Sequence, residues 1–521
     1  MPLIARANDV DIEMNPEAPE VGDSCASSEN SAKELIKHAN NPRHEDTIQD
    51  VAVANIFSLA WFNQSRLTAW QRLKRSTSDN SETDGDSVTS AGLQDMYNTV
   101  KIPENASFFT KLKAFMGPGI LVAVGYMDPG NWATDLAGGS AYNNSLLFII
   151  LLANVMAMYL QGLSLRLGLA SGLDLAQACR SKCHWALNLF LWVTCEVAIA
   201  ACDLAEVVGS AIAMKLLFGL PVIYGCLITA ADVLLLLLFA LGTIRRIEGL
   251  IALLMGAILV SMVVQLALAR PDGTDVMLGL CGAQIGPLFS DSQMLLVAIG
   301  IIGATVMPHN LYLHSSLVQT RDVPRDQPAK VKEAMTLGLV DSCISLSLAF
   351  FINASILMLS AATFHRAGQT EVAELEDAYH MLGGLLGNNV APVLFGVALL
   401  CAGQQSTLTG TLAGQIVMQG FVSIKIRPAL RRLLSRMLAV VPAVVCLAVM
   451  GDDMTGKLLV FSQVILSFQL PFAVVPLVYF TSSRSMMGDY VNGRVSMAVG
   501  VLLALLLVVL NLLLIVQSFS G

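Results

Sequence analysis

Long apolar runs separated by short polar segments make up the chain from about residue 115 to residue 517. Runs such as LLFIILLANVMAMYLQGLSL and SCISLSLAFFINASILMLSAATF hold no charged residue. About 20 such residues span the hydrocarbon core of a bilayer as a helix. The pattern predicts eleven membrane-spanning helices, near 115–139, 146–169, 187–214, 221–243, 248–269, 292–317, 334–363, 389–420, 433–450, 457–481 and 495–517.

The polar segments between these spans alternate in charge. Those after the even-numbered spans are basic, as in RRIE and KIRPALRRLLSR, whereas the others, such as AYNNS and GDDMTGK, hold few bases. Basic loops stay on the cytoplasmic side of a membrane. We therefore expect a cytoplasmic N-terminus and, with eleven spans, a C-terminus on the opposite side.

Composition agrees with a multi-pass membrane protein. The 521 residues are 55% hydrophobic and 13% charged, with a mean hydropathy of +0.64. Soluble domains carry about 25% charged residues. The expected fold class is all-α integral membrane.

The first hundred residues differ from the rest. They hold 8 Lys/Arg and 16 Asp/Glu, so the whole formal net charge of −8 lies there. We expect residues 1–106 to form a disordered acidic cytoplasmic tail, with an amphipathic helix over 55–75, and residues 107–519 to form the membrane domain. A regulatory or sorting tail and a merely solvated extension both fit this composition.

The first and sixth spans are interrupted by a proline near their middle. They read GYMDPGNW and ATVMPHNL, so residues 128–131 correspond to residues 307–310. A five-span unit used twice inserts in opposite orientations, because five is odd. Interrupted helices at matching positions of inverted repeats mark the midplane site of secondary transporters. We expect repeat one over about 115–269, repeat two over about 292–481 and an extra helix over about 495–517.

The two interruptions supply candidate cation ligands. Proline has no N–H, so Pro129 releases the carbonyl of Gly125 and Pro308 releases that of Ala304. The side chains add a carboxylate from Asp128, an amide oxygen from Asn131 and a thioether from Met307. A thioether offers Ca²⁺ and Mg²⁺ nothing but binds softer ions such as Mn²⁺, Fe²⁺, Co²⁺ or Cd²⁺. Core packing of Met307 is the alternative.

Further titratable residues lie in other spans. The third span places Glu196, Asp203 and Glu206 on one helical face, because they are spaced by seven and three residues. Three acids facing lipid would be costly, so we expect this face to look into the bundle and to form a proton relay or a structural network. His309 and His314 of the sixth span titrate near physiological pH.

Basic residues lie at the beginning of the ninth span. Arg431, Arg432 and Arg436 would be counter-charges along a cytoplasmic exit path. Anchoring at the cytoplasmic membrane surface is the alternative, and the two explanations have equal standing for Arg436.

Four motifs together resemble the Nramp family of proton-coupled divalent-metal transporters: DPGN in span 1, DLAE in span 3, ATVMPHN in span 6 and AGQQSTLTGTLAGQ in span 8. The resemblance covers about residues 107–517 and is closest to the bacterial manganese transporters. It implies the LeuT-like fold, with ten spans in two inverted repeats plus an eleventh helix. It also implies import of Mn²⁺ or Fe²⁺ toward the cytosol with protons, with Co²⁺ and Cd²⁺ as further substrates and no cofactor.

The resemblance assigns roles to individual residues. It implies that Asp128, Asn131 and Met307 bind the metal, together with the Gly125 and Ala304 carbonyls in different states. Gln463 of span 10 matches a position that joins the metal in the closed state. It implies a proton route through His309, Asp203, Glu206 and Glu196 that leads toward Arg431 and Arg432. Gln405 departs from the family, since many members have serine there.

Other classes of protein remain as alternatives. A sodium-coupled symporter would need hydroxyl-rich sodium sites near the breaks, and a sensor would need a large soluble domain. A channel would not need the paired breaks, and no nucleophile–base pair or cofactor motif indicates an enzyme. We expect no nucleic-acid partner, a functional monomer in the lipid bilayer, and a location in the plasma membrane or an endosomal or vacuolar membrane.

Overall fold

The computed structural model describes residues 96–229, 244–370, 372, 374–422, 437, 440–449 and 455–520. The predicted amphipathic helix over 55–75 and most of the predicted tail lie outside these residues. Arg431, Arg432 and Arg436 also lie outside them.

The described residues are almost entirely helical. The α-helices are α4 (Phe108–Phe115), α5 (Pro118–Ala123), α6 (Pro129–Tyr142), α7 (Leu147–Ser171), α8 (Leu175–Lys182), α9 (Trp185–Phe218), α11 (Ile244–Ala269), α12 (Gly273–Leu280), α13 (Ser292–Thr305), α14 (Pro308–Leu317), α15 (Pro328–Thr363), α16 (Leu375–Leu386), α17 (Val390–Val422), α19 (Thr455–Thr481), α20 (Arg484–Met487) and α21 (Arg494–Ser520). The 3-10 turns are η4 (Val124–Met127), η5 (Gly286–Phe289), η6 (Val318–Thr320), η7 (His365–Ala367) and η9 (Gly488–Tyr490). The two short strands are β1 (Val100–Lys101) and β2 (Arg321–Asp322).

Most of the predicted spans are confirmed. Within the described residues, eight helices are long and apolar enough to cross a membrane, or up to nine if a pair bent by 48° counts as one span. The first predicted span is divided into α5, η4 and α6. Predicted spans four and nine run into residues that the structure does not describe, so the total of eleven stays a prediction.

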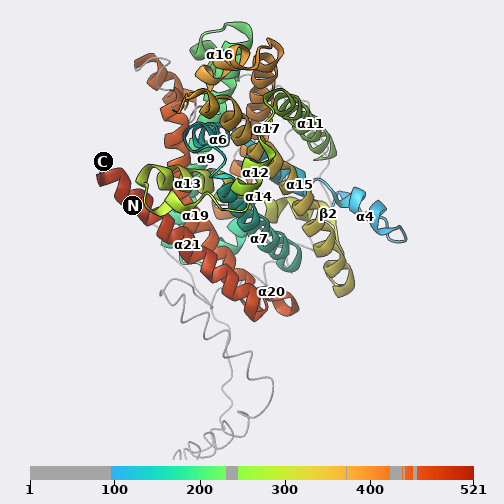
Figure 1. Ribbon diagram of the computed structural model, residues 1–521. Helices are drawn as coiled ribbons and strands as arrows, with labels where there is room; N and C mark the ends of the chain where they lie inside the picture. The colour runs from blue at the N-terminus through green and yellow to red at the C-terminus, as the bar shows by residue number, and fades with distance from the viewer. Residues whose placement is uncertain are drawn as a thin grey trace, which may run out of the picture. The chain divides into compact units, whose positions relative to one another are not determined.

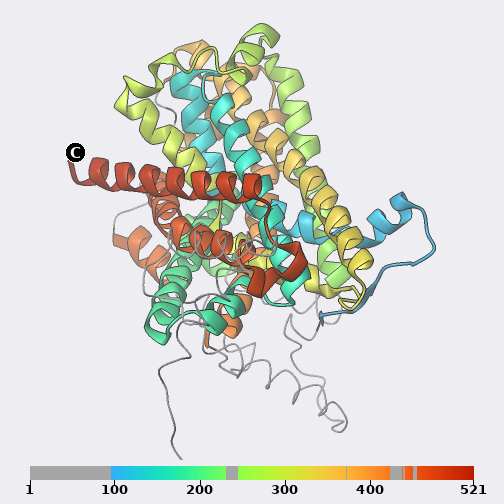
Figure 2. The ribbon, with the colours of Figure 1, turned by 90° about the horizontal axis from the view of Figure 1, so that it is seen from below.

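The helices pack with α6, α9, α13, α14 and α17 in the middle of the bundle (Figure 1). The C-terminal helix α21, red in Figures 1 and 2, packs against α19 at the outside. Its outer face carries exposed apolar side chains, among them Val495 and Leu502. An exposed apolar surface of this kind suits contact with lipid rather than water.

A cluster of charged groups holds the start of α5, and we call Glu248, Arg321 and Asp341 the α5 clamp. The side chain of Arg321 is fully buried and lies 2.9 Å from a carboxylate oxygen of Glu248. It also donates hydrogen bonds to the carbonyls of Phe115 and Met116, both at 2.9 Å. These bonds tie the residues just before α5 to α11 and to β2.

Asp341 of α15 completes the α5 clamp. Its Oδ2 accepts hydrogen bonds from the backbone N–H groups of Gly117 at 3.2 Å and Gly119 at 2.8 Å. The first N–H groups of a helix have no partner inside it, so a carboxylate at this point stabilises the helix start. Gly117 has φ +144°, and a Cβ there would overlap the carboxylate of Glu248. The position therefore requires glycine.

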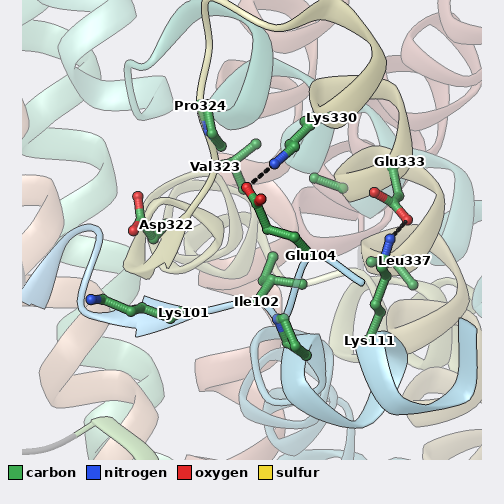
Figure 3. Close-up of a pocket in the computed structure, with 12 residues that line it drawn as sticks. Lys101, Ile102, Glu104, Lys111, Asp322, Val323, Pro324, Lys330, Glu333 and Leu337 are labelled. Atoms are coloured by element: carbon green, nitrogen blue, oxygen red, sulfur yellow. Dashed lines mark hydrogen bonds and ion pairs between the residues drawn. The ribbon is translucent and has the colours of Figure 1, made fainter. Parts of the chain in front are cut away.

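The segment before α4 packs beside the start of α15. β1 pairs in parallel with β2, and a cavity of about 270 Å³ lies next to them (Figure 3). Four of its charged groups are paired, since Lys111 lies 2.6 Å from Glu333 and Lys330 contacts Glu104. The hydrogen bond and the positive charge of Lys330 lower the pKa of Glu104. None of the residues that line this cavity belongs to the two helix breaks.

Candidate functional site

The first helix break lies where the sequence predicts it. η4 ends at Met127, Asp128 is extended with φ −69° and ψ 165°, and α6 begins at Pro129. Asp128 caps the new helix, since its Oδ1 accepts a hydrogen bond from the backbone N–H of Asn131 at 2.8 Å. An aspartate is among the preferred residues at this position because its oxygen satisfies an otherwise unpaired N–H group.

The second break has the same form. α13 ends at Thr305, and α14 begins at Pro308. Between them Val306 and Met307 leave the helical conformation, with φ −90°, ψ 80° and φ −77°, ψ 125°. Met307 occupies the place of Asp128 but makes no side-chain capping bond. Its thioether is thus available for another contact.

Asn131 joins the two breaks. Its side-chain Nδ2 lies 2.7 Å from Asp128 Oδ1, 3.1 Å from the carbonyl oxygen of Ala304 and 3.4 Å from that of Gly125. An NH₂ group has two hydrogens, so three acceptors compete for them. The structure therefore brings together four of the predicted ligands, including both carbonyls released by proline.

The orientation of the Asn131 amide bears on cation binding. The oxygen and nitrogen of an amide are assigned from their hydrogen-bond partners. Turning the amide over would place its oxygen among the carboxylate and the two carbonyls. Four oxygens would then converge, with the backbone N–H of Asn131 as a donor to one of them, an arrangement that suits a cation.

Gln463 of α19 lies against the first break. A Cβ on Gly130 would overlap the Gln463 amide and come within 3.2 Å of Asp128 Oδ2. Among the residues that the structure describes, neither Asp128 Oδ2 nor Gln463 Oε1 has a hydrogen-bond partner, although both are buried. Gly130 is required because helix α19 approaches so closely, and Gln463 is where the family resemblance implies a ligand.

Met307 lies in an apolar contact cluster. Its side chain is fully buried and packs with Ala198 and Cys202 of α9 and with Leu466 of α19. The surroundings of Met307 are compatible with a soft ligand for a cation and equally with a side chain that only packs in the core.

Two of the three predicted acids come together. Asp203 and Glu206 are buried and both face α17, where a Cβ on Gly410 would lie 3.0 Å from Asp203 Oδ1 and 3.1 Å from Glu206 Oε1. Ser406 donates a hydrogen bond to Glu206 Oε1 at 2.6 Å. The acidic face of α9 thus looks into the bundle, as expected. Glu196 lies two turns away, half-buried, and accepts a hydrogen bond from Trp192 at 2.9 Å.

The two histidines of α14 belong to different clusters. His309 is buried and its Nε2 lies 4.0 Å from Cys202 Sγ, on the side of the acids. His314 instead has its Nδ1 3.0 Å from Gln161 Oε1, and Gln161 donates to the hydroxyl of Tyr126 at 2.9 Å. His309 therefore fits the predicted proton route, whereas His314 joins α14 to α7 and to η4.

Two polar contacts at the first break were not anticipated from the sequence. Asn353 of α15 donates a hydrogen bond to the backbone carbonyl of Tyr126 at 2.7 Å, and Gln161 of α7 binds the side chain of the same residue. The available signal was the presence of amide residues inside apolar runs, Asn154 and Gln161 in one and Asn353 in the other. Such residues inside a membrane usually serve packing contacts between helices or function.

The donor set differs from that of a permanent metal centre. Among the residues described, no three His, Cys, Asp or Glu side chains are grouped so as to hold a metal ion. The converging donors are one carboxylate, one amide, two carbonyls and, on the other break, a thioether. A site through which ions pass must bind them weakly enough to release them.

Comparison with known proteins identifies the family of the chain. The family model described as natural resistance-associated macrophage protein-like matches residues 119–517. The chain belongs to the Nramp family. This match includes both breaks and the acidic face of α9, so the predicted family is confirmed.

Individual relatives agree with the Nramp assignment. The divalent metal cation transporter MntH of Nostoc sp. is 50% identical over 82% of this chain and 96% of its own length. MntH of Bradyrhizobium diazoefficiens is 49% identical over 84% of this chain and 96% of its own. A crystal structure of the Eremococcus coleocola manganese transporter superposes with a TM-score of 0.77 at 39% identity, covering 83% of this chain and 92% of the other.

These findings confirm the predicted fold class. The chain is an all-α, multi-pass integral membrane protein that shares its fold with the Eremococcus coleocola manganese transporter. The proposed repeat and domain boundaries are not tested by these comparisons and stay predictions.

Proposed function

We propose that the chain is a secondary active transporter that imports divalent transition-metal ions, Mn²⁺ or Fe²⁺, toward the cytosol together with protons, by alternating access. The observation that carries the proposal is the convergence of Asp128 Oδ1 and the carbonyls of Gly125 and Ala304 on Asn131. The names of the relatives, divalent metal cation transporter and manganese transporter, support this class of substrate.

Binding would take place between the two breaks. An arriving ion sheds most of its water, and the oxygens around Asn131 replace that water in a buried site. Asp128 supplies the negative charge, and the thioether of Met307 favours the softer transition metals over Ca²⁺ and Mg²⁺. Gln463 would join the ion when α19 closes over the site. Co²⁺ and Cd²⁺ are expected as further substrates.

Protons would use the neighbouring face of α9. His309 lies beside the metal ligands, and Cys202 lies between it and Glu206. From there Asp203 and Glu206 continue toward Glu196 and, in the residues not described, toward Arg431 and Arg432. Rocking of the broken helices would open the site to the cytosol, and an inside-negative potential would favour inward movement of cations.

The sequence supports a proposal for location and assembly. We expect a plasma, endosomal or vacuolar membrane, with the N-terminus cytoplasmic and the C-terminus on the opposite side. The site is formed by one chain, so a monomer would be sufficient. No catalytic role is part of the proposal.

Replacing Met307 by alanine tests the proposed selectivity. We expect Met307→Ala to retain measurable Mn²⁺ uptake into proteoliposomes while admitting Ca²⁺ or Mg²⁺. The reason is that the variant loses the thioether of the MPHN motif, which favours soft ions. The measurement is the uptake of Mn²⁺ and Ca²⁺, each in competition with the other.

The matched control is Met294→Ala on the same predicted span, since Met294 is equally buried but lies near the other end of α13. It should leave the ratio of Mn²⁺ to Ca²⁺ uptake unchanged. An unchanged ratio in Met307→Ala as well would mean that Met307 only packs in the core.

A further inference from the structure

A groove of about 330 Å³ lies on the outside of the bundle, between α7, α15 and α21. Apolar side chains of α7 and α15 form most of its lining, among them Met158, Leu163, Met335 and Leu339. Leu339 is 45% exposed. All three helices are long and apolar enough to cross a membrane, so the groove faces lipid acyl chains rather than water.

Small residues bring α7 and α15 together at the floor of the groove. A Cβ on Gly338 of α15 would overlap the side chain of Leu165, and a Cβ on Gly162 of α7 would lie 3.3 Å from Leu339 Cδ1. Glycine lets two membrane helices approach closely. The floor of the groove is therefore formed by packed helices rather than by a loop.

One end of the groove is polar and carries a positive charge. Arg166 is half-buried and, among the described residues that line the groove, it is the one charged residue. Its Nη1 donates a hydrogen bond to Asn492 Oδ1 and its Nη2 to the carbonyl of Tyr490, both at 2.8 Å. Both partners are neutral, so these bonds hold the guanidinium in place without cancelling its charge.

A second basic residue lies beside this end on α15. Lys332 is exposed and precedes the lining residues Met335 and Thr336 by three and four positions, so it shares their helical face. The neighbouring acid Glu333 lies 2.6 Å from Lys111, which balances its charge. The mouth of the groove is therefore basic.

The basic end lies at the depth of lipid phosphate groups. Arg166 is five residues before the end of α7, and Lys332 is four residues after the start of α15. At 1.5 Å per residue they lie about 8 Å and about 6 Å from these helix ends. The alternation of basic loops places both ends on the cytoplasmic side, where anionic lipids are concentrated.

We propose that this groove binds an anionic phospholipid of the cytoplasmic leaflet, with one acyl chain along α7 and α15 and its phosphate between Arg166 and Lys332. An apolar groove alone would accept the chain of any lipid. Two bases at its end favour a headgroup with a net negative charge over a zwitterionic one. The inference goes beyond the proposed function, since the groove includes no residue of the helix breaks.

Native mass spectrometry of the full-length protein, stripped of lipid in detergent, tests the headgroup preference. The probes are dioleoylphosphatidylglycerol, which is anionic, and dioleoylphosphatidylcholine, which is zwitterionic and has the same acyl chains. We expect the wild type to bind one phosphatidylglycerol about 25-fold more tightly, since each of the two bases contributes a factor of about five. Lys332→Gln should lower this preference to about fivefold.

Thr336→Trp tests the acyl-chain part of the groove and leaves Arg166 and its bonds in place. Thr336 is exposed, and its hydroxyl donates to the carbonyl of Lys332 in its own helix at 3.0 Å. An indole at this position would fill the groove. We expect phosphatidylglycerol to bind about tenfold more weakly, because its chain loses apolar contacts.

The matched controls are Lys113→Gln and Thr194→Trp. Lys113 is an exposed lysine on α4, and the Thr194 hydroxyl likewise donates to its own helix, to the Phe190 carbonyl at 3.0 Å. Neither residue lines the groove. Both controls should keep the wild-type lipid affinities, and all four variants should unfold at the wild-type temperature without lipid.

Three results would overturn the inference. The first is equal affinity of the wild type for the two lipids, and the second is unchanged phosphatidylglycerol binding in both Lys332→Gln and Thr336→Trp. The third is an equal loss of binding in the controls, which would mean that the lipid binds elsewhere. The measurement needs no metal ion, so its outcome is separate from that of the transport assays.

Discussion

Asp128→Asn is expected to abolish Mn²⁺ uptake and to weaken Mn²⁺ binding by about 30-fold or more. The substitution keeps the shape of the side chain and removes the carboxylate, which is the only acidic group in the two break motifs DPGN and MPHN. Truncating one partner of a buried, hydrogen-bonded charge pair costs about 2–5 kcal/mol, and 1.4 kcal/mol corresponds to a factor of ten in affinity. Binding is measured by calorimetry and uptake in proteoliposomes.

The matched control is Asp272→Asn. Asp272 also caps a helix, α12, by accepting a hydrogen bond from the N–H of Thr274 at 3.0 Å, but it is exposed. Its substitution should change neither Mn²⁺ binding nor uptake. Asp128→Asn protein that still bound Mn²⁺ with wild-type affinity would show that the carboxylate is a structural cap and that the ion binds elsewhere.

Arg321→Met is expected to cause the largest loss of stability. The fully buried guanidinium pairs with Glu248 and satisfies the carbonyls of Phe115 and Met116. Removing one partner of a buried ion pair costs about 3–5 kcal/mol, because the other charge is left uncompensated. We expect thermal unfolding of the detergent-purified variant at a clearly lower temperature.

Two further variants separate the charge effect from a general packing defect. Arg321→Met combined with Glu248→Leu should recover part of the lost stability, since no buried charge is then unpaired. Lys111→Met breaks a pair whose partner Glu333 is 42% exposed, so its effect should stay within about 1 kcal/mol. Equal losses in Arg321→Met and Lys111→Met would contradict the role assigned to the α5 clamp.

The helix breaks are the part of the site that the sequence predicts best. Proline inside an apolar run removes one helical hydrogen bond whatever the rest of the chain does. For this reason the breaks at Asp128 and Met307 lie where expected, and the released carbonyls are those of Gly125 and Ala304. The acidic face of α9 is equally local, because spacing along one helix decides which side chains share a face.

Contacts between distant segments were not predictable in the same way. The α5 clamp joins residues from three segments of the chain, and no single segment contains a pattern that would indicate the pairing. His309 and His314 look equivalent in sequence, yet one lies beside Cys202 and the other beside Gln161. Which helix each histidine meets depends on the packing of α14 between α7 and α9, and periodicity alone does not define it.

The surroundings of Cys202 are likewise not predictable from the sequence. In the sequence it is one of ten cysteines, and a cysteine in an apolar run usually behaves as a small hydrophobic residue. Its proximity to Met307 depends on how α9 crosses the second break. Only the three-dimensional arrangement distinguishes it from Cys195 on the same helix.

The most direct test of the account is to follow Mn²⁺ uptake and internal pH together in proteoliposomes that contain the wild-type protein. The account predicts that Mn²⁺ enters and that the interior acidifies only when Mn²⁺ is supplied outside. Mn²⁺ uptake without acidification would contradict proton coupling and leave Asp203 and Glu206 a structural role. No uptake by a folded protein would contradict the metal transport on which the site assignment rests.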